Sequence, residues 1–252
     1  MSGFRAATGF LTRVPVNVGH LDQGSLARAV RWFPLVGALI GLFVGAVYLS
    51  FYEIVGPMAA ATLAVISGVA ITGAFHEDGL ADVFDSAGSS SREDRLRILK
   101  DPRLGTYGAA ALFGSLLLRM TALASMDRWT GVAFCVCAHS VARAAAVGLM
   151  RASSVGPDGL GAAYVRELND NDVAIAVASG LVLGGLAAGP WIMPSGVVAL
   201  CVAAVVGWRA RRALGGISGD YLGATEQLVE IGVYMIGAAV SMNSLIDAAW
   251  WR

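Results

Sequence analysis

Residues 34–52 read PLVGALIGLFVGAVYLSFY and contain no charged side chain. About 20 mostly apolar residues are enough for a helix to cross the hydrocarbon core of a bilayer. Six more apolar runs follow, at residues 57–74, 108–125, 131–150, 173–190, 196–208 and 228–250. The run at 173–190 is interrupted by Gly184 and Gly185, and the run at 196–208 is short. The sequence therefore predicts an all-α polytopic membrane bundle of about seven transmembrane helices, within a range of six to eight. We expect a single domain over residues 1–252.

The composition supports a membrane protein and excludes several other classes. Hydrophobic residues make up 56% of the chain and charged residues 14%, with a mean hydropathy of +0.67. A soluble domain has roughly 25% charged residues. The net charge of zero leaves no basic excess for nucleic acid, and disordered chains are poor in apolar residues. The three cysteines lie in apolar runs without metal-ligand spacing, so neither a disulfide framework nor a zinc site is indicated.

The N-terminal segment predicts an amphipathic helix that lies at the membrane interface. Between residues 4 and 16, apolar residues recur at helical spacing with arginines between them, until Pro15 ends the pattern. The apolar positions are Phe4, Ala7, Phe10, Leu11 and Val14, and the arginines are Arg5 and Arg13. No signal peptide is expected, because no apolar segment with a cleavage site precedes the first run.

The basic residues predict the orientation. Fourteen of the 18 lie before the first run or after the second, fourth and sixth runs, whereas only Arg128 and Arg252 lie in the opposite connections. Basic residues are enriched in cytoplasmic loops, so we expect the N-terminus in the cytoplasm. Most acids follow the same partition, which places the expected active site on the cytoplasmic face.

Residues 75–85, FHEDGLADVFD, carry the clearest functional pattern. If the second run continues as a helix past the membrane, Asp78, Asp82 and Asp85 fall at i, i+4 and i+7 on one face. Three like charges repel one another, and Mg²⁺ is commonly held by one or two carboxylates together with substrate phosphates. The sequence therefore favours a magnesium site here. The alternative is a solvated acidic helix end.

Basic residues follow in a second motif at 92–105, where a short helix is expected to end at Pro102. Lys100, the only lysine of the chain, and Arg103 lie near its C-terminal end. The helix dipole alone favours cations there. The functional hypothesis is that both residues bind phosphate oxygens.

Two arginines lie inside apolar runs and need an anionic partner, because a charge at membrane depth is costly. Arg143 shares a helix face with His139, and its partner is expected to be a carboxylate of the acidic stripe or a substrate phosphate. For Arg119, a helix-to-helix ion pair is the simpler interpretation.

A glycine-rich turn precedes the last run, and residues 215–226 read GGISGDYLGATE. Ser218, Asp220 and Thr225 supply oxygens in a segment whose backbone can approach a ligand closely. We expect Asp220 to join the site, although an ordinary turn between spans is the alternative. Glu226 and Glu230 continue one turn apart into the run.

Together these motifs resemble the cobalamin synthase family (adenosylcobinamide-GDP ribazoletransferase). The resemblance rests on His76-x-Asp78-Gly-Leu-Ala-Asp82-x-x-Asp85, on Leu99-Lys100-Asp101-x-Arg103-x-Gly105-x-x-Gly108 and on Gly219-Asp220-x-x-Gly223-Ala-x-Glu226. FLTRVP at 10–15 and FPLVG at 33–37 fit the same family. The chain departs from the family at Pro102, where Ser is usual, and at Ser218, where Thr is more usual.

The resemblance implies a Mg²⁺-dependent enzyme of the bacterial or archaeal cytoplasmic membrane. It would join adenosylcobinamide-GDP to α-ribazole or its 5′-phosphate and release GMP. No nucleic acid is expected as a partner, whereas a homo-oligomer or a complex with other cobalamin-assembly enzymes is an open expectation.

We assign hypothetical roles on this basis. The metal ligands would be Asp78, Asp82 and Asp85, with Asp101 or Asp220 completing a second site. The diphosphate would contact Lys100, Arg103, Arg143 and Ser218. The catalytic residues would be Asp82, Asp85 and His76. The proton of the attacking hydroxyl would be accepted by Asp85, Asp220 or His76. Alternatively, His76 would support the metal ligands by hydrogen bonding.

Two other functions remain as alternatives. The Asp78-Gly-Leu-Ala81 pattern is faintly similar to the CDP-alcohol phosphotransferases, but the first Asp expected there falls at Phe75 and the expected Arg falls at Asp82. A transporter would suit seven spans with buried arginines. The absence of a convincing internal repeat and the clustering of charges at one face favour an enzyme.

Overall fold

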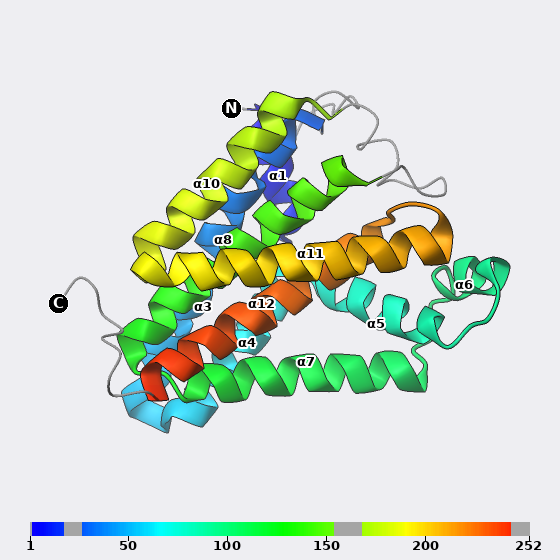
Figure 1. Cartoon of the computed structure of the whole chain (residues 1–252). Helices are drawn as coiled ribbons and strands as arrows, with labels where there is room; N and C mark the ends of the chain where they lie inside the picture. The colour runs from blue at the N-terminus through cyan, green and yellow to red at the C-terminus, as the bar shows by residue number, and fades with distance from the viewer. Residues whose placement is uncertain (1, 18–26, 154–167, 243–252) are drawn as a thin grey trace.

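The computed structural model describes residues 2–17, 27–153 and 168–242, and every element in these ranges is helical (Figure 1). Short 3₁₀ turns, Val30–Trp32 and Gly189–Trp191, precede α3 and α11. The α-helices are α1 (Ser2–Leu11), α3 (Phe33–Val55), α4 (Pro57–Thr72), α5 (Phe75–Ala87), α6 (Arg92–Ile98), α7 (Thr106–Ala124), α8 (Arg128–Ala152), α10 (Asp170–Ala188), α11 (Ile192–Leu214) and α12 (Gly219–Met242). The predicted all-α fold is confirmed.

Helix α8 forms the centre of the bundle and contacts α3, α10, α11 and α12. Its approach to α3 depends on Gly37, Gly41 and Gly45, which recur every fourth residue on one face of α3. A Cβ atom on Gly37 would lie 2.4 Å from the carbonyl oxygen of His139, and one on Gly41 would lie 2.3 Å from that of Cys135. Small residues at this spacing let two membrane helices pack backbone to backbone.

The outer surfaces of the helices are apolar, as expected where lipid is the solvent. Large hydrophobic side chains are highly exposed on α7, α10 and α11, including Phe113, Leu186, Met193 and Leu200. By length and composition, four helical stretches of the described chain could cross a membrane, or up to five if the bent pair α4–α5 counts as one span. One of the four, Asp170–Leu214, contains both α10 and α11, which run in different directions (Figure 1). Several apolar helices thus indicate a multi-pass membrane protein.

Each of the seven predicted apolar runs coincides with a helix, although the last run extends beyond Met242, outside the described residues. One expectation is wrong: the second run does not continue straight into the acidic segment. Helix α4 ends at Thr72, Gly73 and Ala74 both have left-handed backbone angles (φ 69° and 59°), and α5 leaves at 90° to α4. Because α5 is itself helical, the i, i+4, i+7 relation of its three aspartates still holds.

The N-terminal helix is shorter than predicted. Helix α1 ends at Leu11, and the backbone N–H of Arg13 donates to the carbonyl oxygen of Ile71 at 2.7 Å. Phe10 stacks against Phe33 and meets Phe75 edge to face. The segment after α1 therefore leaves the helix because it packs at the bend between α4 and α5.

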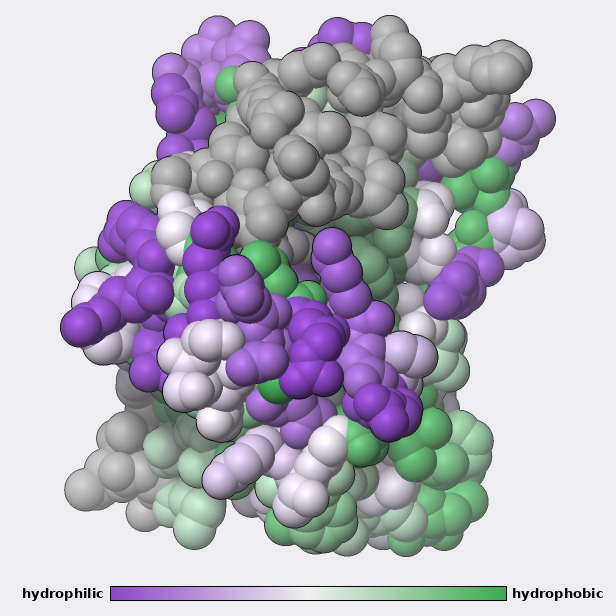
Figure 2. Space-filling model, turned by 90° about the vertical axis from the view of Figure 1, so that its right-hand side faces the viewer, coloured by the Kyte–Doolittle hydropathy of each residue, from purple (hydrophilic) through white to green (hydrophobic). Residues whose placement is uncertain are grey.

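Polar residues gather on one side of the molecule. Figure 2 shows the side that lies at the right in Figure 1, where α6 and the adjoining ends of α5, α7 and α11 are found. Hydrophilic residues extend across the middle of this face, and hydrophobic residues lie below them. The candidate site belongs to these helix ends.

Candidate active site

Two polar assemblies lie side by side along α5 and α12. The first, called here the acidic cavity, has a volume of about 330 Å³ and opens to the surface. Its lining comes from α5 and from the segment between α6 and α7: Asp78, Ala81, Asp82, Leu99, Lys100, Asp101, Pro102, Arg103 and Leu104. The structure therefore brings together two acids of the first predicted motif and the basic residues of the second.

The close packing of α5 on α12 adds the third motif to the edge of this cavity. A Cβ atom on Gly79 would lie 2.9 Å from the backbone oxygen of Asp220, and one on Gly223 would lie 3.3 Å from the Cα atom of His76. The two helices meet almost backbone to backbone, so Asp220 at the start of α12 lies beside the aspartates of α5. The hydroxyl of Ser218 donates to Asp220 Oδ2 at 3.3 Å.

The carboxylates at this junction interact strongly. Burial raises the pKa of Asp82 to about 7, and the charges of Asp78, Asp220 and Asp85 add to this shift. Burial also raises the pKa of Asp220, an effect that the Ser218 hydrogen bond opposes and the Asp78 charge reinforces. Such an arrangement favours a bound cation, which relieves the repulsion between the carboxylates.

The positions of the side chains limit which residues can serve as metal ligands. Within the described ranges, no three His, Cys, Asp or Glu side chains are arranged to hold one metal ion. Asp101 accepts hydrogen bonds from the Arg103 guanidinium at 2.9 and 2.6 Å, which lower its pKa to about 2. Asp78 and Asp82 line the cavity, and two carboxylates together with substrate phosphates are a common Mg²⁺ environment. The donor set therefore fits Mg²⁺ only with oxygens supplied by a substrate.

Asp85, the third aspartate of the stripe, is not part of the cavity lining. Its Oδ2 accepts the backbone N–H of Gly105 at 2.7 Å, and its Oδ1 accepts that of Gly108 at 2.7 Å. Both acceptors thus bind the beginning of α7.

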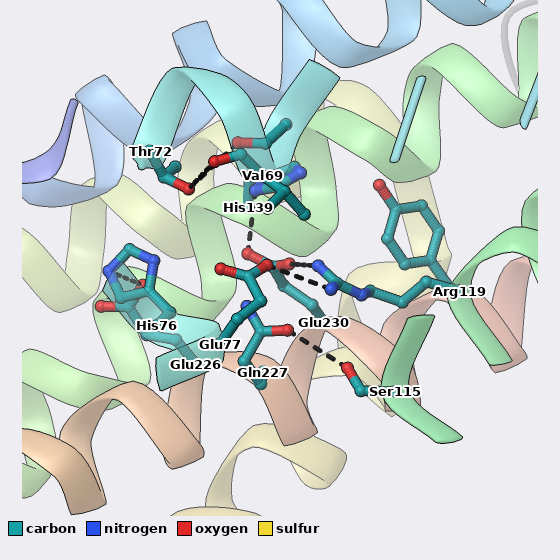
Figure 3. A network of polar contacts seen from close by, with 12 residues as sticks. Val69, Thr72, His76, Glu77, Ser115, Arg119, His139, Glu226, Gln227 and Glu230 are labelled. Atoms are coloured by element: carbon teal, nitrogen blue, oxygen red, sulfur yellow. Dashed lines mark hydrogen bonds and ion pairs between the residues drawn. The ribbon is translucent and has the colours of Figure 1, made fainter. Parts of the chain in front are cut away.

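The second assembly, called the buried cluster, joins four helices in the interior (Figure 3). Its ionisable side chains are all 5% exposed or less and come from α5, α7, α8 and α12. They are His76, Glu77, Arg119, His139, Arg143, Glu226 and Glu230. Two arginines therefore face three glutamates at the centre of the bundle.

Most contacts within the buried cluster join different helices. Arg119 lies 3.1 Å from Glu77 and 3.2 Å from Glu230. Glu230 also lies 2.8 Å from Nδ1 of His139 and pairs with Arg143.

The cluster also reaches Glu226 and the neutral residues around it. His76 Nε2 lies 2.9 Å from Glu226 Oε2, and Arg143 Nε lies 3.2 Å from the same oxygen. Neither of these two contacts has the alignment of a hydrogen bond. Ser115 donates to Gln227 at 3.2 Å.

Besides Asp85, two more predicted site residues lie away from the acidic cavity. Arg143 has no exposed surface, and its carboxylate partners come from α12 and not from the acidic stripe. His76 is also buried and faces Glu226. Neither side chain can contact a substrate as it stands. The ion-pair interpretation of Arg119 is confirmed.

Sequence reasoning overlooked the role of Glu77 and drew no conclusion from Glu226 and Glu230. The signal was present: two arginines inside apolar runs require acids at the same depth, and Glu226 and Glu230 lie one helical turn apart. Glu77 was difficult to assign because it lies among the aspartates of the surface stripe.

Similarity to known proteins covers almost the whole chain. A family model described as cobalamin-5-phosphate synthase matches residues 3–238. The adenosylcobinamide-GDP ribazoletransferase of Bradyrhizobium diazoefficiens is 39% identical over 96% of this chain and 95% of its own length. The proteins of the same name from Shewanella denitrificans and Shewanella oneidensis are 36% and 35% identical, over 96% and 92% of this chain and 95% and 92% of their own lengths. No solved structure matches the chain.

Proposed function

The chain belongs to the cobalamin-5-phosphate synthase family, and on this premise we propose that it is an adenosylcobinamide-GDP ribazoletransferase. The structural observation that supports the proposal is the acidic cavity, in which Asp78 and Asp82 lie on one wall and Lys100 and Arg103 on the other. A diphosphate with a divalent cation needs both kinds of group. The family membership favours this activity over a CDP-alcohol phosphotransferase or a transporter.

The reaction is a phosphoryl transfer. A ribose hydroxyl of α-ribazole, or of its 5′-phosphate, attacks the phosphorus nearer the cobinamide. A new P–O bond forms, the bond to the bridging oxygen breaks, and GMP leaves with that oxygen. Such reactions depend mainly on positioning and on neutralisation of charge.

The charged residues of the cavity each have a role in this reaction. Lys100 and Arg103 bind the diphosphate oxygens, and Asp101 holds the Arg103 guanidinium in place. Asp82 is the group we assign to accept the proton of the attacking hydroxyl, because its carboxylate lines the cavity together with Lys100 and Arg103. Ser218 orients Asp220 at the edge of the site.

Mg²⁺ would be held by Asp78 and Asp82, with Asp220 beside them, and when bound it supplies neutralisation of the diphosphate charge. Asp101 is engaged by Arg103 and is a poorer candidate ligand. We assign Arg143 and His76 to the buried cluster instead of the substrate site.

The proposed topology has seven spans, with the N-terminus and the acidic cavity on the cytoplasmic side of the membrane. The distribution of basic residues along the sequence supports this orientation. The substrates are large, polar and phosphorylated, so a cytoplasmic site also agrees with their chemistry. We also propose that the protein forms a homo-oligomer or a complex with other cobalamin-assembly enzymes.

An assay of the purified protein tests the function directly. Protein in nanodiscs is incubated with adenosylcobinamide-GDP, α-ribazole and Mg²⁺, and GMP and the corrinoid product are measured by chromatography. We expect equimolar GMP and adenosylcobalamin, and no product from D82A. Absence of product with Mg²⁺, Mn²⁺ and Co²⁺, whether the acceptor is α-ribazole or its 5′-phosphate, would refute the proposed activity.

A further inference from the structure

The carboxylate of Asp85 is fully engaged by backbone N–H groups. The two oxygens each accept one hydrogen bond at 2.7 Å, from Gly105 and from Gly108. Gly105 is the residue immediately before α7, and Gly108 lies in the first turn of that helix. The first N–H groups of a helix have no partner within the helix, and an anion is stabilised beside them.

The contact leaves no space for anything larger than glycine at either position. A Cβ atom on Gly105 would lie 2.4 Å from Asp85 Oδ1. A Cβ atom on Gly108 would lie 2.3 Å from Asp85 Oδ2 and 2.8 Å from the backbone oxygen of Ala81. The glycines therefore let α5 approach the beginning of α7 closely enough for both hydrogen bonds to form.

This contact fixes one wall of the acidic cavity relative to the other. The segment 99–104, which provides Lys100 and Arg103, leads directly into Gly105. On the opposite wall, Asp78 and Asp82 lie seven and three residues before Asp85 on the same helix. A bond from α5 to Gly105 thus sets the distance across which basic and acidic side chains face each other.

We propose that Asp85 is a positioning residue, which holds segment 99–105 against α5 and is not a magnesium ligand. The expected effect on catalysis rests on the proposed function, whereas the contact between Asp85 and the two glycines does not depend on it. It changes the role that the sequence pattern predicts for Asp85, because equal spacing along α5 does not give the three aspartates equal surroundings.

Hydrogen exchange and kinetics of two variants, compared with two controls, test the proposal. D85N replaces one acceptor with an NH₂ group that faces a backbone N–H, and G108A displaces Asp85 without changing any carboxylate. We expect both variants to increase amide exchange in a peptide covering residues 99–108 by at least about tenfold, since a hydrogen bond to a charged group is lost. Both should raise the KM for adenosylcobinamide-GDP and, at saturating adenosylcobinamide-GDP, leave the Mg²⁺ concentration for half-maximal rate unchanged.

The matched contrast is D78N, which removes a cavity carboxylate from the same helix. We expect D78N to raise the half-saturating Mg²⁺ concentration and to leave exchange at residues 99–108 unchanged. The proposal is overturned if D85N shifts Mg²⁺ saturation as D78N does, or if exchange at residues 99–108 is unchanged in D85N or G108A.

The exchange measurement also separates this proposal from the proposed function. It needs no substrate, so it reports on the contact between Asp85 and α7 even if the wild-type protein forms no cobalamin. If D85N does not fold, G108A provides the same readout with Asp85 intact. A G114A variant serves as the control, because a Cβ atom on Gly114 of α7 would meet nothing within 4 Å.

Discussion

Arg119 Nη2 lies 3.1 Å from Oε1 of Glu77, and both side chains are buried. Glu77 directly precedes Asp78 of the acidic cavity, whereas Arg119 lies in the second half of α7. Through Glu230, the same arginine also holds α12, which carries Asp220. The buried cluster thus fixes the two helices on which the carboxylates of the site are placed.

Replacing Arg119 should destabilise the whole bundle. R119Q leaves Glu77 and Glu230 with a missing cationic partner in the interior, and breaking a buried pair in this way costs about 3–5 kcal/mol. We expect a clearly lower Tm in detergent, measured by tryptophan fluorescence. R128Q is the control, because the pair between Arg128 and Glu53 is exposed and such pairs contribute little. Equal Tm values for the two variants would contradict the role assigned to the buried cluster.

The contribution of Asp82 to the stability of the protein without divalent cations should fall as the pH rises from about 4 to about 7. The pKa of Asp82 is raised to about 7 in the folded state, by burial first and by neighbouring aspartates second. The folded state therefore binds more protons than the unfolded state in this range, and the stabilisation present at low pH is lost as Asp82 ionises. The difference in Tm between the wild type and D82N, measured from pH 4 to 8 in EDTA, should show this dependence.

The decrease of Tm with rising pH should be smaller in D82N, which cannot ionise at this position. Mg²⁺ should raise the Tm of the wild type more at pH 8 than at pH 5, because the cation competes with the proton for the same carboxylates. An unchanged slope in D82N would show that Asp82 does not cause the pH dependence.

Close contact between α5 and α12 should be essential to the site. In G79A, the new methyl group would lie 2.9 Å from the backbone oxygen and 3.0 Å from the Cα atom of Asp220, so the helices must separate. Overpacking of this kind costs about 1–3 kcal/mol, and we expect most of the transferase activity to be lost. G114A should retain activity and gain up to about 1 kcal/mol from helix propensity. Wild-type rates in G79A would show that the site tolerates a wider separation.

Lys100 should contribute to substrate binding more than to folding. It is exposed at the cavity and has no ion pair within the described residues. K100Q should raise the KM for adenosylcobinamide-GDP by about tenfold or more, since a charge-assisted hydrogen bond to phosphate is removed, and its Tm should equal that of the wild type. A normal KM in K100Q would exclude Lys100 from the diphosphate site.

Hydrophobic patterning was sufficient to predict the helices, because a membrane segment must satisfy its backbone hydrogen bonds within itself. The runs at 34–52 and 131–150 correspond to α3 and α8 without ambiguity. The break at Gly73 and Ala74 was not predicted, since it needs a left-handed conformation at Ala74 as well as at Gly73, and a residue other than glycine rarely adopts one.

Spacing alone was a weaker guide to the site. It placed Asp78, Asp82 and Asp85 on one face, and the structure agrees, but it could not show that Asp85 points to the glycines before and within α7. Arg143 illustrates the same limit. The sequence established that it needs an anion, whereas the choice between a phosphate and Glu226 with Glu230 depends on how α8 and α12 pack.

The order of the helices along the chain gives the buried cluster a consequence for biosynthesis. Arg119 and Arg143 lie on α7 and α8, and two of the three glutamates that neutralise them lie on α12, the last of the described helices. During synthesis, both arginines leave the ribosome before Glu226 and Glu230 are made, with only Glu77 preceding them. The bundle therefore cannot close around its charges until α12 arrives, and Asp220 arrives with it. A chain that lacks α12 has the residues that line the cavity but neither Asp220 nor the helix that packs against Gly79 of α5, so completion of the site is coupled to completion of the fold.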